Sequence, residues 1–228
     1  MPRQMLSALF LIAVNTVPLV GVLLFDWSLF SIVFLYWIEN GIVGFFNVLK
    51  IAWARKPVSP ESRFTVNNRP AGRASKLVII PSFIFHYGMF WVVHGVFVIV
   101  FFGLLGDRFF ADSSGPSGDI GGFSGFEPRG VAIAAAALLL SHGVSFVVNF
   151  LGEREYLNVS PDEQMIEPYS RVVVLHATIL GGGFLAAYLG TPLASLVLMI
   201  VLKTALDLRA HLKEHRKAQQ GPATTTVT

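Results

Sequence analysis

Six ionisable side chains stand inside long apolar runs of this chain, where a charge is costly unless it has a partner. They are Glu39, His86, His142, His176, Lys203 and Asp207. Imidazoles and carboxylates without any cysteine suit a zinc or iron ion with nitrogen and oxygen ligands. Such an ion would activate a water or a substrate carbonyl. The sequence therefore predicts a metal site of His86, His142 and His176, with Glu39, Lys203 and Asp207 as catalytic groups.

Helical rise predicts that these groups share one depth. At about 1.5 Å per residue, Glu39 lies ~16 Å and His142 ~18 Å from the outer ends of their segments, while His86 and His176 lie ~13 and ~10 Å from the cytoplasmic ends. All six fall between the bilayer centre and the cytoplasmic side. Lys203 needs a counter-ion at this depth, and we predict Glu39 for it, with Asp207 as the other candidate. His94 lies in the outer half.

The elements that must position these residues are apolar segments separated by short polar connections. The chain has 228 residues, of which 54% are hydrophobic and 14% charged, with a mean hydropathy of +0.63. Each apolar segment holds about 20 residues or more, enough to cross the hydrocarbon core as a helix. The predicted fold is an all-α polytopic membrane domain over 1–211, followed by a disordered tail over 212–228. The six predicted helices are about 5–25, 28–51, 77–105, 130–151, 169–189 and 192–211, with no internal repeat.

The basic residues predict the orientation in the membrane. Lys and Arg gather in the connection of residues 52–76 and in the C-terminal tail, so both termini are predicted to be cytoplasmic. The same rule accounts for the net charge of +3. The sequence contains no basic stripe with interleaved aromatic residues, so we expect no nucleic-acid binding. The acidic connection "EREYLNVSPDEQMIEP" falls on the cytoplasmic side by alternation. We therefore expect a multi-pass protein of an inner, cytoplasmic membrane.

Several stretches of the sequence resemble a known family. "YWIENGIVGFFNVLK", "HYGMFWVVHGVF", "SHGVSFVVNF", "PYSRVVVLHATILGGG" and "LKTALDLRAHLKEH" are similar to an uncharacterised prokaryotic membrane family, a domain of unknown function. The resemblance covers nearly the whole apolar region. It implies a shared polar site and brings no activity, substrate or ligand.

Three function classes remain open from the sequence. The polar slab favours a metal-dependent membrane enzyme with a site open to the cytoplasm, acting on a lipid-like substrate. A chain of Glu, His, Lys and Asp across half the membrane is also typical of a small ion or proton transporter. A structural or partner-binding membrane protein is the third class. The lipid bilayer is the expected partner, and a homo-oligomer is compatible with the small size of the domain.

Overall fold

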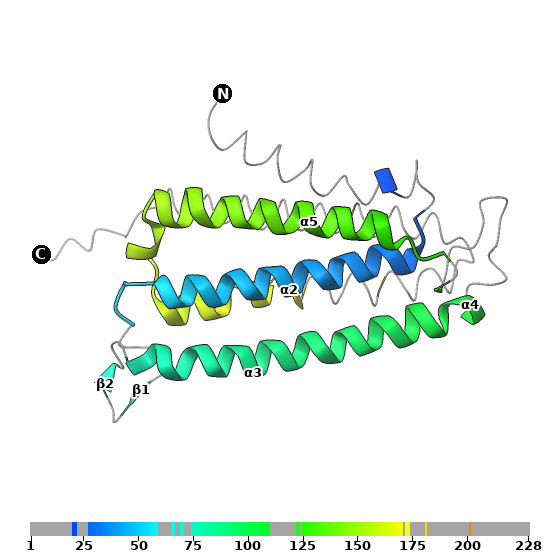
Figure 1. The fold of residues 1–228 in the computed structure, drawn as a ribbon. Coiled ribbons are helices and arrows are strands. Elements are labelled where there is room, and N and C mark those ends of the chain that lie inside the picture. Colours follow the sequence, from blue (N-terminus) through cyan, green and yellow to red (C-terminus); the bar gives the residue numbers. More distant parts are fainter. Residues whose placement is uncertain are drawn as a thin grey trace, which may run out of the picture.

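The computed structural model describes residues 20–21, 27–58, 65–66, 69–70, 74–109, 122–123, 125–170, 172–173, 181 and 201. Figure 1 shows that this part of the chain is built from long helices lying side by side. The tail and all but residues 20–21 and 201 of the predicted helices 5–25 and 192–211 lie outside the described residues, as does most of 169–189. The described elements are α2 (Leu29–Trp53), β1 (Thr65–Val66), β2 (Arg69–Pro70), α3 (Ala74–Phe97), the π-helix η1 (Val98–Leu104), α4 (Gly106–Phe109), α5 (Pro128–Ser145), the π-helix η3 (Phe146–Gly152) and the 3₁₀-helix η4 (Glu155–Leu157).

Three helices of the described chain are long and apolar enough to cross a membrane. They are Leu29–Trp53, Lys76–Leu104 and Pro128–Gly152, with 25, 29 and 25 residues. Even 25 residues extend ~37 Å, which exceeds the ~30 Å of hydrocarbon in a bilayer. The described chain is helical apart from an antiparallel pair of two-residue strands, β1 and β2, in the connection between α2 and α3. The prediction of helices that could span a membrane is confirmed for these three.

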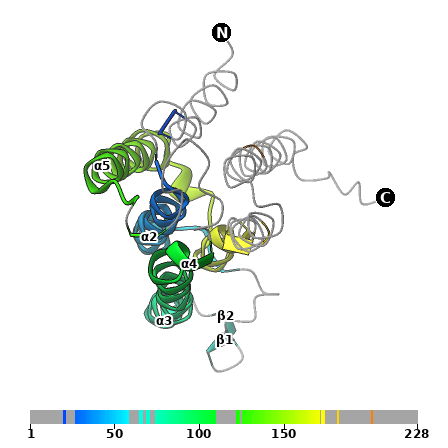
Figure 2. The ribbon, with the colours of Figure 1, turned by 90° about the vertical axis from the view of Figure 1, so that its right-hand side faces the viewer.

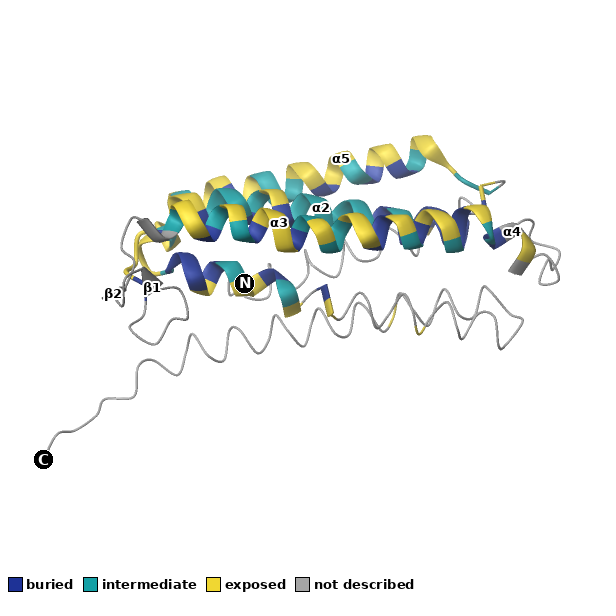
Figure 3. Ribbon diagram, turned by 90° about the horizontal axis from the view of Figure 1, so that it is seen from below, coloured by how far each residue is buried: buried dark blue, intermediate teal, exposed yellow. Residues whose placement is uncertain are grey.

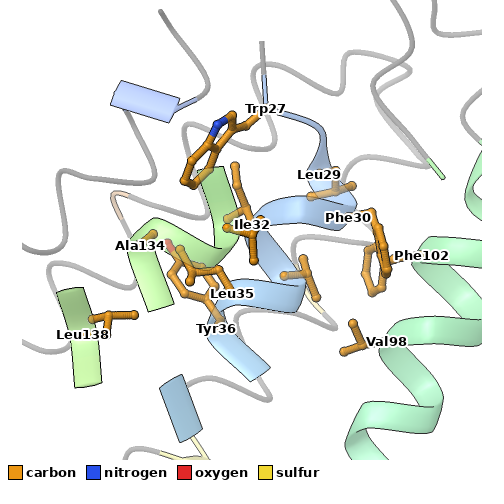
Figure 4. Close-up of a cluster of buried hydrophobic side chains, with 12 residues drawn as sticks. Trp27, Leu29, Phe30, Ile32, Leu35, Tyr36, Val98, Phe102, Ala134 and Leu138 are labelled. Carbon is orange, nitrogen blue, oxygen red and sulfur yellow. The ribbon is translucent and has the colours of Figure 1, made fainter. Parts of the chain in front are cut away.

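Helix α2 lies between α3 and α5, as Figure 2 shows in a view along the helices. Its N-terminal half forms the centre of the larger apolar core, where aromatic and branched side chains of the three helices interlock (Figure 4). Burying such side chains contributes about 1.5–3 kcal/mol each relative to water, and dispersion contacts take over that role in lipid. The buried members are Trp27, Leu29, Phe30, Ile32, Val33, Leu35, Tyr36, Val98, Phe102, Val131, Ala134 and Leu138.

Polar groups fix both ends of α2. Ser28 is the N-cap, and its hydroxyl accepts a hydrogen bond from the Ser31 backbone N–H at 3.2 Å. The Ser31 hydroxyl accepts one from the Glu127 backbone N–H, which joins the start of α5 to the start of α2. At the other end, the Lys76 ammonium donates to the Ala52 carbonyl at 2.8 Å, one of the carbonyls without a helical partner.

The outward faces of α3 and α5 are apolar and exposed, as the yellow surfaces in Figure 3 show. Large side chains on them include Ile84, Val93, Ile133 and Leu140. A water-soluble helix would carry charged residues there. These faces suit contact with lipid.

The acidic connection after α5 differs from the prediction. A helix covers 161–170, so it begins before residue 169, where the sequence predicted a helix to start. Its start has one half of a capping box: the Ser160 backbone N–H donates to the Glu163 carboxylate at 3.1 Å, and Pro161 follows at the first helical position. The prediction followed hydropathy, which is low over "SPDEQ", and missed this local signal. Four polar side chains of this helix contact α2, α3 or the connection after α2: Glu163, Gln164, Glu167 and Tyr169.

Candidate functional site between α2, α3 and the 161–170 helix

His86 stands on α3 with its imidazole toward the 161–170 helix. Its Nδ1 lies 2.8 Å from the hydroxyl oxygen of Tyr169, so the two side chains are hydrogen-bonded. The Tyr169 ring is held edge-on against Phe83 and Tyr87 of the same helix. Below it, Ile51, Ile79 and Val172 continue a second apolar cluster. Aromatic packing therefore fixes the hydroxyl group that His86 meets.

His142 lies on another side of the bundle. It is half-buried on α5, and its ring faces Phe46 of α2 with 6.3 Å between the ring centroids. His86 on α3 meets Tyr169, whereas His142 on α5 meets Phe46, and Figure 2 shows α2 between α3 and α5. Within the described part of the chain, no group of three or more His, Asp or Glu side chains could hold a metal ion. The predicted three-histidine site finds no support there, and His176, Lys203 and Asp207 lie outside the described residues.

The expected polar face of α5 also changes near its end. A regular α-helix, at 100° per residue, would put His142, Ser145 and Asn149 on one face. From Phe146 the helix is a π-helix, whose wider turn shifts that register. Asn149 still reaches Ser145, donating to its hydroxyl at 3.3 Å, but both side chains are exposed.

Glu39 is half-buried near the middle of α2. Two residues before it, Trp37 makes an aromatic contact with Trp91 of α3. The rings of Trp37 and Trp91 stack at 4.5 Å with an interplanar angle of 7°. Each indole N–H donates to the other residue's carbonyl oxygen at 2.9 Å. The two tryptophans therefore lock α2 and α3 together near mid-span.

Glycines make this contact fit. A Cβ on Gly95 would lie 2.6 Å from the Trp37 ring, and one on Gly41 would lie 3.0 Å from the Trp91 ring. Both helices carry the same spacing, "WIENG" in α2 and "WVVHG" in α3, so each tryptophan covers the glycine of the other helix. This short shared pattern can be read from the sequence, but the prediction of no internal repeat missed it. His94, inside the second motif, is buried and stacked between Phe90 and Phe97.

Asn47 and Gln164 form a buried pair between α2 and the 161–170 helix. Figure 1 shows the backbone of this helix, in yellow, beside α2. The Gln164 amide donates to Asn47 Oδ1 at 2.8 Å, and Asn47 Nδ2 donates to the Gln164 backbone carbonyl at 3.1 Å. Their exposed fractions are only 4% and 2%. Gln164 Nε2 also donates to the carboxylate of Glu167.

Lys50 lies one turn further along α2. Its ammonium group is 4.0 Å from Glu167 Oε1 and 5.6 Å from the centre of the Phe150 ring. Desolvation raises the pKa of nearby Glu155 above its ordinary 4.5, while Lys50 lowers it and Glu153 and Glu167 raise it further. Lys50 thus lies among carboxylates and an aromatic ring.

An ion pair closes this end of the bundle. Lys56 Nζ lies 2.9 and 3.1 Å from the two carboxylate oxygens of Glu163. Burial raises the pKa of Glu163, but hydrogen bonds from Lys56 and from Ser160 outweigh it and leave this pKa below 4.5. The pair therefore stabilises the fold above pH 4.5, and this stabilisation is lost as the pH falls through the folded-state pKa. Both side chains are about half exposed, so we expect well under ~1 kcal/mol from it.

Because of these contacts, acidic, basic and amide side chains lie close together between the end of the bundle and the middle of the helices. Sequence reasoning found His86 but missed its partner Tyr169 and the Gln164 and Glu167 of the same helix, because it assigned them to a connection or to the edge of a helix. The capping box "SPDE" could have revealed them. Such a set can bind a cation or pass protons, since Glu, Lys, His and Tyr all exchange them.

A family described only as a family of unknown function, DUF6498, matches residues 2–224. No curated protein and no solved structure matches the chain.

Proposed function

Because the chain belongs to the DUF6498 family, whose function is unknown, we propose its function from the site alone: an integral membrane protein that passes a proton or a small cation. The residues at work are those that the 161–170 helix brings to α2 and α3. This was the second of the function classes left open by the sequence. We rank it before the metal-dependent enzyme, because acidic and basic side chains of the described residues contact one another. Among the same residues, no group of three or more side chains could hold a metal ion.

The hydrogen bond between His86 and Tyr169 carries this proposal. His86 lies ten residues into the span that starts at Lys76, so it is ~15 Å along the helix. An imidazole changes its charge near neutral pH, and ionisable groups inside spans typically mark ion or proton pathways. Between this pair and the bundle end lie Glu167, Lys50 and Glu155. These groups could pass a proton between water and His86.

The proposed protein has six spans with both termini in the cytoplasm of a prokaryotic cell. Two contacts support the arrangement of the connections. The Arg55 backbone N–H donates to the Tyr156 carbonyl at 2.7 Å, and the Lys56 N–H to the Val159 carbonyl at 3.2 Å. The basic connection after α2 and the acidic one after α5 thus share an end, which agrees with alternation across a membrane. A reporter at the C-terminus that reads external would contradict this orientation.

Flux into liposomes tests the proposal. We expect the reconstituted protein to acidify or alkalinise vesicles containing a pH-sensitive dye when a proton gradient is imposed, or to admit Na⁺ or K⁺. His86→Gln should lower the flux at least about tenfold, because the relay loses the side chain that can accept a proton at one ring nitrogen and release one from the other. Tyr169→Phe should lower it by a smaller factor. The control Ser145→Ala, which changes an exposed hydroxyl on α5, should leave it unchanged.

Two results would count against transport. Wild-type flux equal to that of empty liposomes for all three ions would remove the proposal. Flux that is equal in wild type, His86→Gln and Tyr169→Phe would show transport along another path.

A metal-dependent enzyme acting on a lipid-like substrate is the second candidate, and one observation favours it. Metal-bound histidines usually have their second ring nitrogen held by a hydrogen bond, as Tyr169 holds Nδ1 of His86. When Nδ1–H donates to Tyr169, Nε2 keeps the lone pair that a zinc or iron ion needs. In this proposal His142 and His176 would complete the ligands, with Glu39, Lys203 and Asp207 as catalytic groups.

Elemental analysis of the purified protein tests this candidate. We expect about one zinc or iron per chain, and a loss of most of it in His86→Ala, because a structural or catalytic site needs at least three protein ligands. Ser145→Ala should bind as much metal as wild type. Protein that carries no metal after purification and after incubation with either ion would contradict the enzyme proposal.

A further inference from the structure

Pro168 creates a defect within the 161–170 helix. In an α-helix the N–H of each residue bonds to the carbonyl four residues earlier, so residue 168 would bond to the Gln164 carbonyl. Proline has no N–H, and Gln164 is buried at 2% exposure. A buried carbonyl without a donor is costly, and water cannot easily reach this one.

Asn47 of α2 supplies a donor from another helix. Its Nδ2 lies 3.1 Å from the Gln164 carbonyl oxygen, while its Oδ1 accepts from the Gln164 amide at 2.8 Å. One asparagine thus bonds both the backbone and the side chain of Gln164. The residue is itself buried at 4% exposure, so neither bond is weakened much by competing water.

The pairing also reaches the charged groups. The amide of Gln164 donates to Asn47 and to Glu167. Glu167 in turn lies 4.0 Å from the Lys50 ammonium. Because the hydrogen bond to Asn47 fixes the orientation of the Gln164 side-chain amide, it also directs the other N–H of that amide toward Glu167.

We propose that Asn47 is a positioning residue that replaces the helical hydrogen bond missing at Pro168 and thereby sets the Glu167 carboxylate beside Lys50. The 161–170 helix is fixed to α2 at the point where its own hydrogen bonding is interrupted. This inference goes beyond the proposed function, and its test does not depend on whether the protein transports ions.

A double-mutant cycle tests the replacement. In wild type, Asn47→Ala should lower the Tm in detergent by roughly 4–8 °C, because it leaves two buried groups of Gln164 without partners. In the Pro168→Ala background the new N–H can bond to the Gln164 carbonyl, so the same change should lower the Tm only about half as much. Asn149→Ala is the matched control, since its amide is exposed on η3, and its loss should be equal in both backgrounds.

The milder variant Asn47→Ser covers the case in which Asn47→Ala does not fold, and it should show the same pattern. An Asn47→Ala protein that folds only with Pro168→Ala would support the proposal as a rescue. Equal losses of Tm in both backgrounds, for Asn47→Ala or for Asn47→Ser, would overturn it.

Discussion

Replacing Gly95 with alanine should destabilise the protein by about 1–3 kcal/mol relative to Gly88→Ala on the same helix. The new methyl carbon would lie 2.6 Å from the Trp37 ring, well inside van der Waals contact. That ring cannot easily move away, because it is stacked on Trp91 and hydrogen-bonded to its carbonyl. The two helices would have to separate or the indole would have to leave its bond.

Gly88 makes the comparison a controlled one. A Cβ there meets nothing within 4 Å, so alanine adds only its better helix propensity, at most ~1 kcal/mol in favour of the fold. Thermal or denaturant unfolding in the same detergent measures both variants. Equal stabilities of Gly95→Ala and Gly88→Ala would mean that the contact between the tryptophans and glycines is looser than the structure shows.

Replacing Trp37 with leucine should cost about 3–5 kcal/mol, a value at the upper end for a single side chain. The change removes the stacked ring, its N–H bond to Trp91 and the cover over Gly95. It also leaves the Trp91 indole without its stacking partner. Trp91→Leu should therefore lower the free energy of unfolding much less in the Trp37→Leu variant than in wild type. The coupling free energy of this double-mutant cycle should reach up to ~3 kcal/mol.

Trp53 provides the control for size and residue type. It also lies on α2, but 47% of it is exposed, and its ring meets Phe146 of η3 edge-on. Trp53→Leu should cost less than half as much as Trp37→Leu. The same unfolding measurement gives all four values, and additive losses for Trp37 and Trp91 would show that the two rings do not act as a unit.

The tryptophan contact also bears on the site. It holds α2 and α3 rigidly together, and Asn47 and His86 stand on these two helices, further toward the end of the bundle. The 161–170 helix meets them through hydrogen bonds, an ion pair and one aromatic residue. We therefore expect changes at Trp37 or Trp91 to disturb the site through the spacing of α2 and α3.

Part of the candidate site could be predicted and part could not. His86 was found because a polar residue in an apolar run is visible in the sequence and costly in lipid. Its grouping with His142 rested on equal depth. Depth does not determine which side of a helix meets which neighbour, and α2 lies between α3 and α5, the helices that carry these two residues. Tyr169 and Glu167 were missed because hydropathy does not register a helix that starts with "SPDEQ".

The sequence by itself determined the long apolar helices, because the need to satisfy every backbone group in lipid makes any apolar run of ~20 residues helical whatever lies beside it. It also showed which polar residues require a partner. Only the tertiary structure decided who the partners are. Trp37 and Trp91 set how α2 and α3 are rotated against each other, and Pro168 left a carbonyl that Asn47 could reach. Both depend on side chains from distant parts of the chain, and no local pattern encodes their meeting.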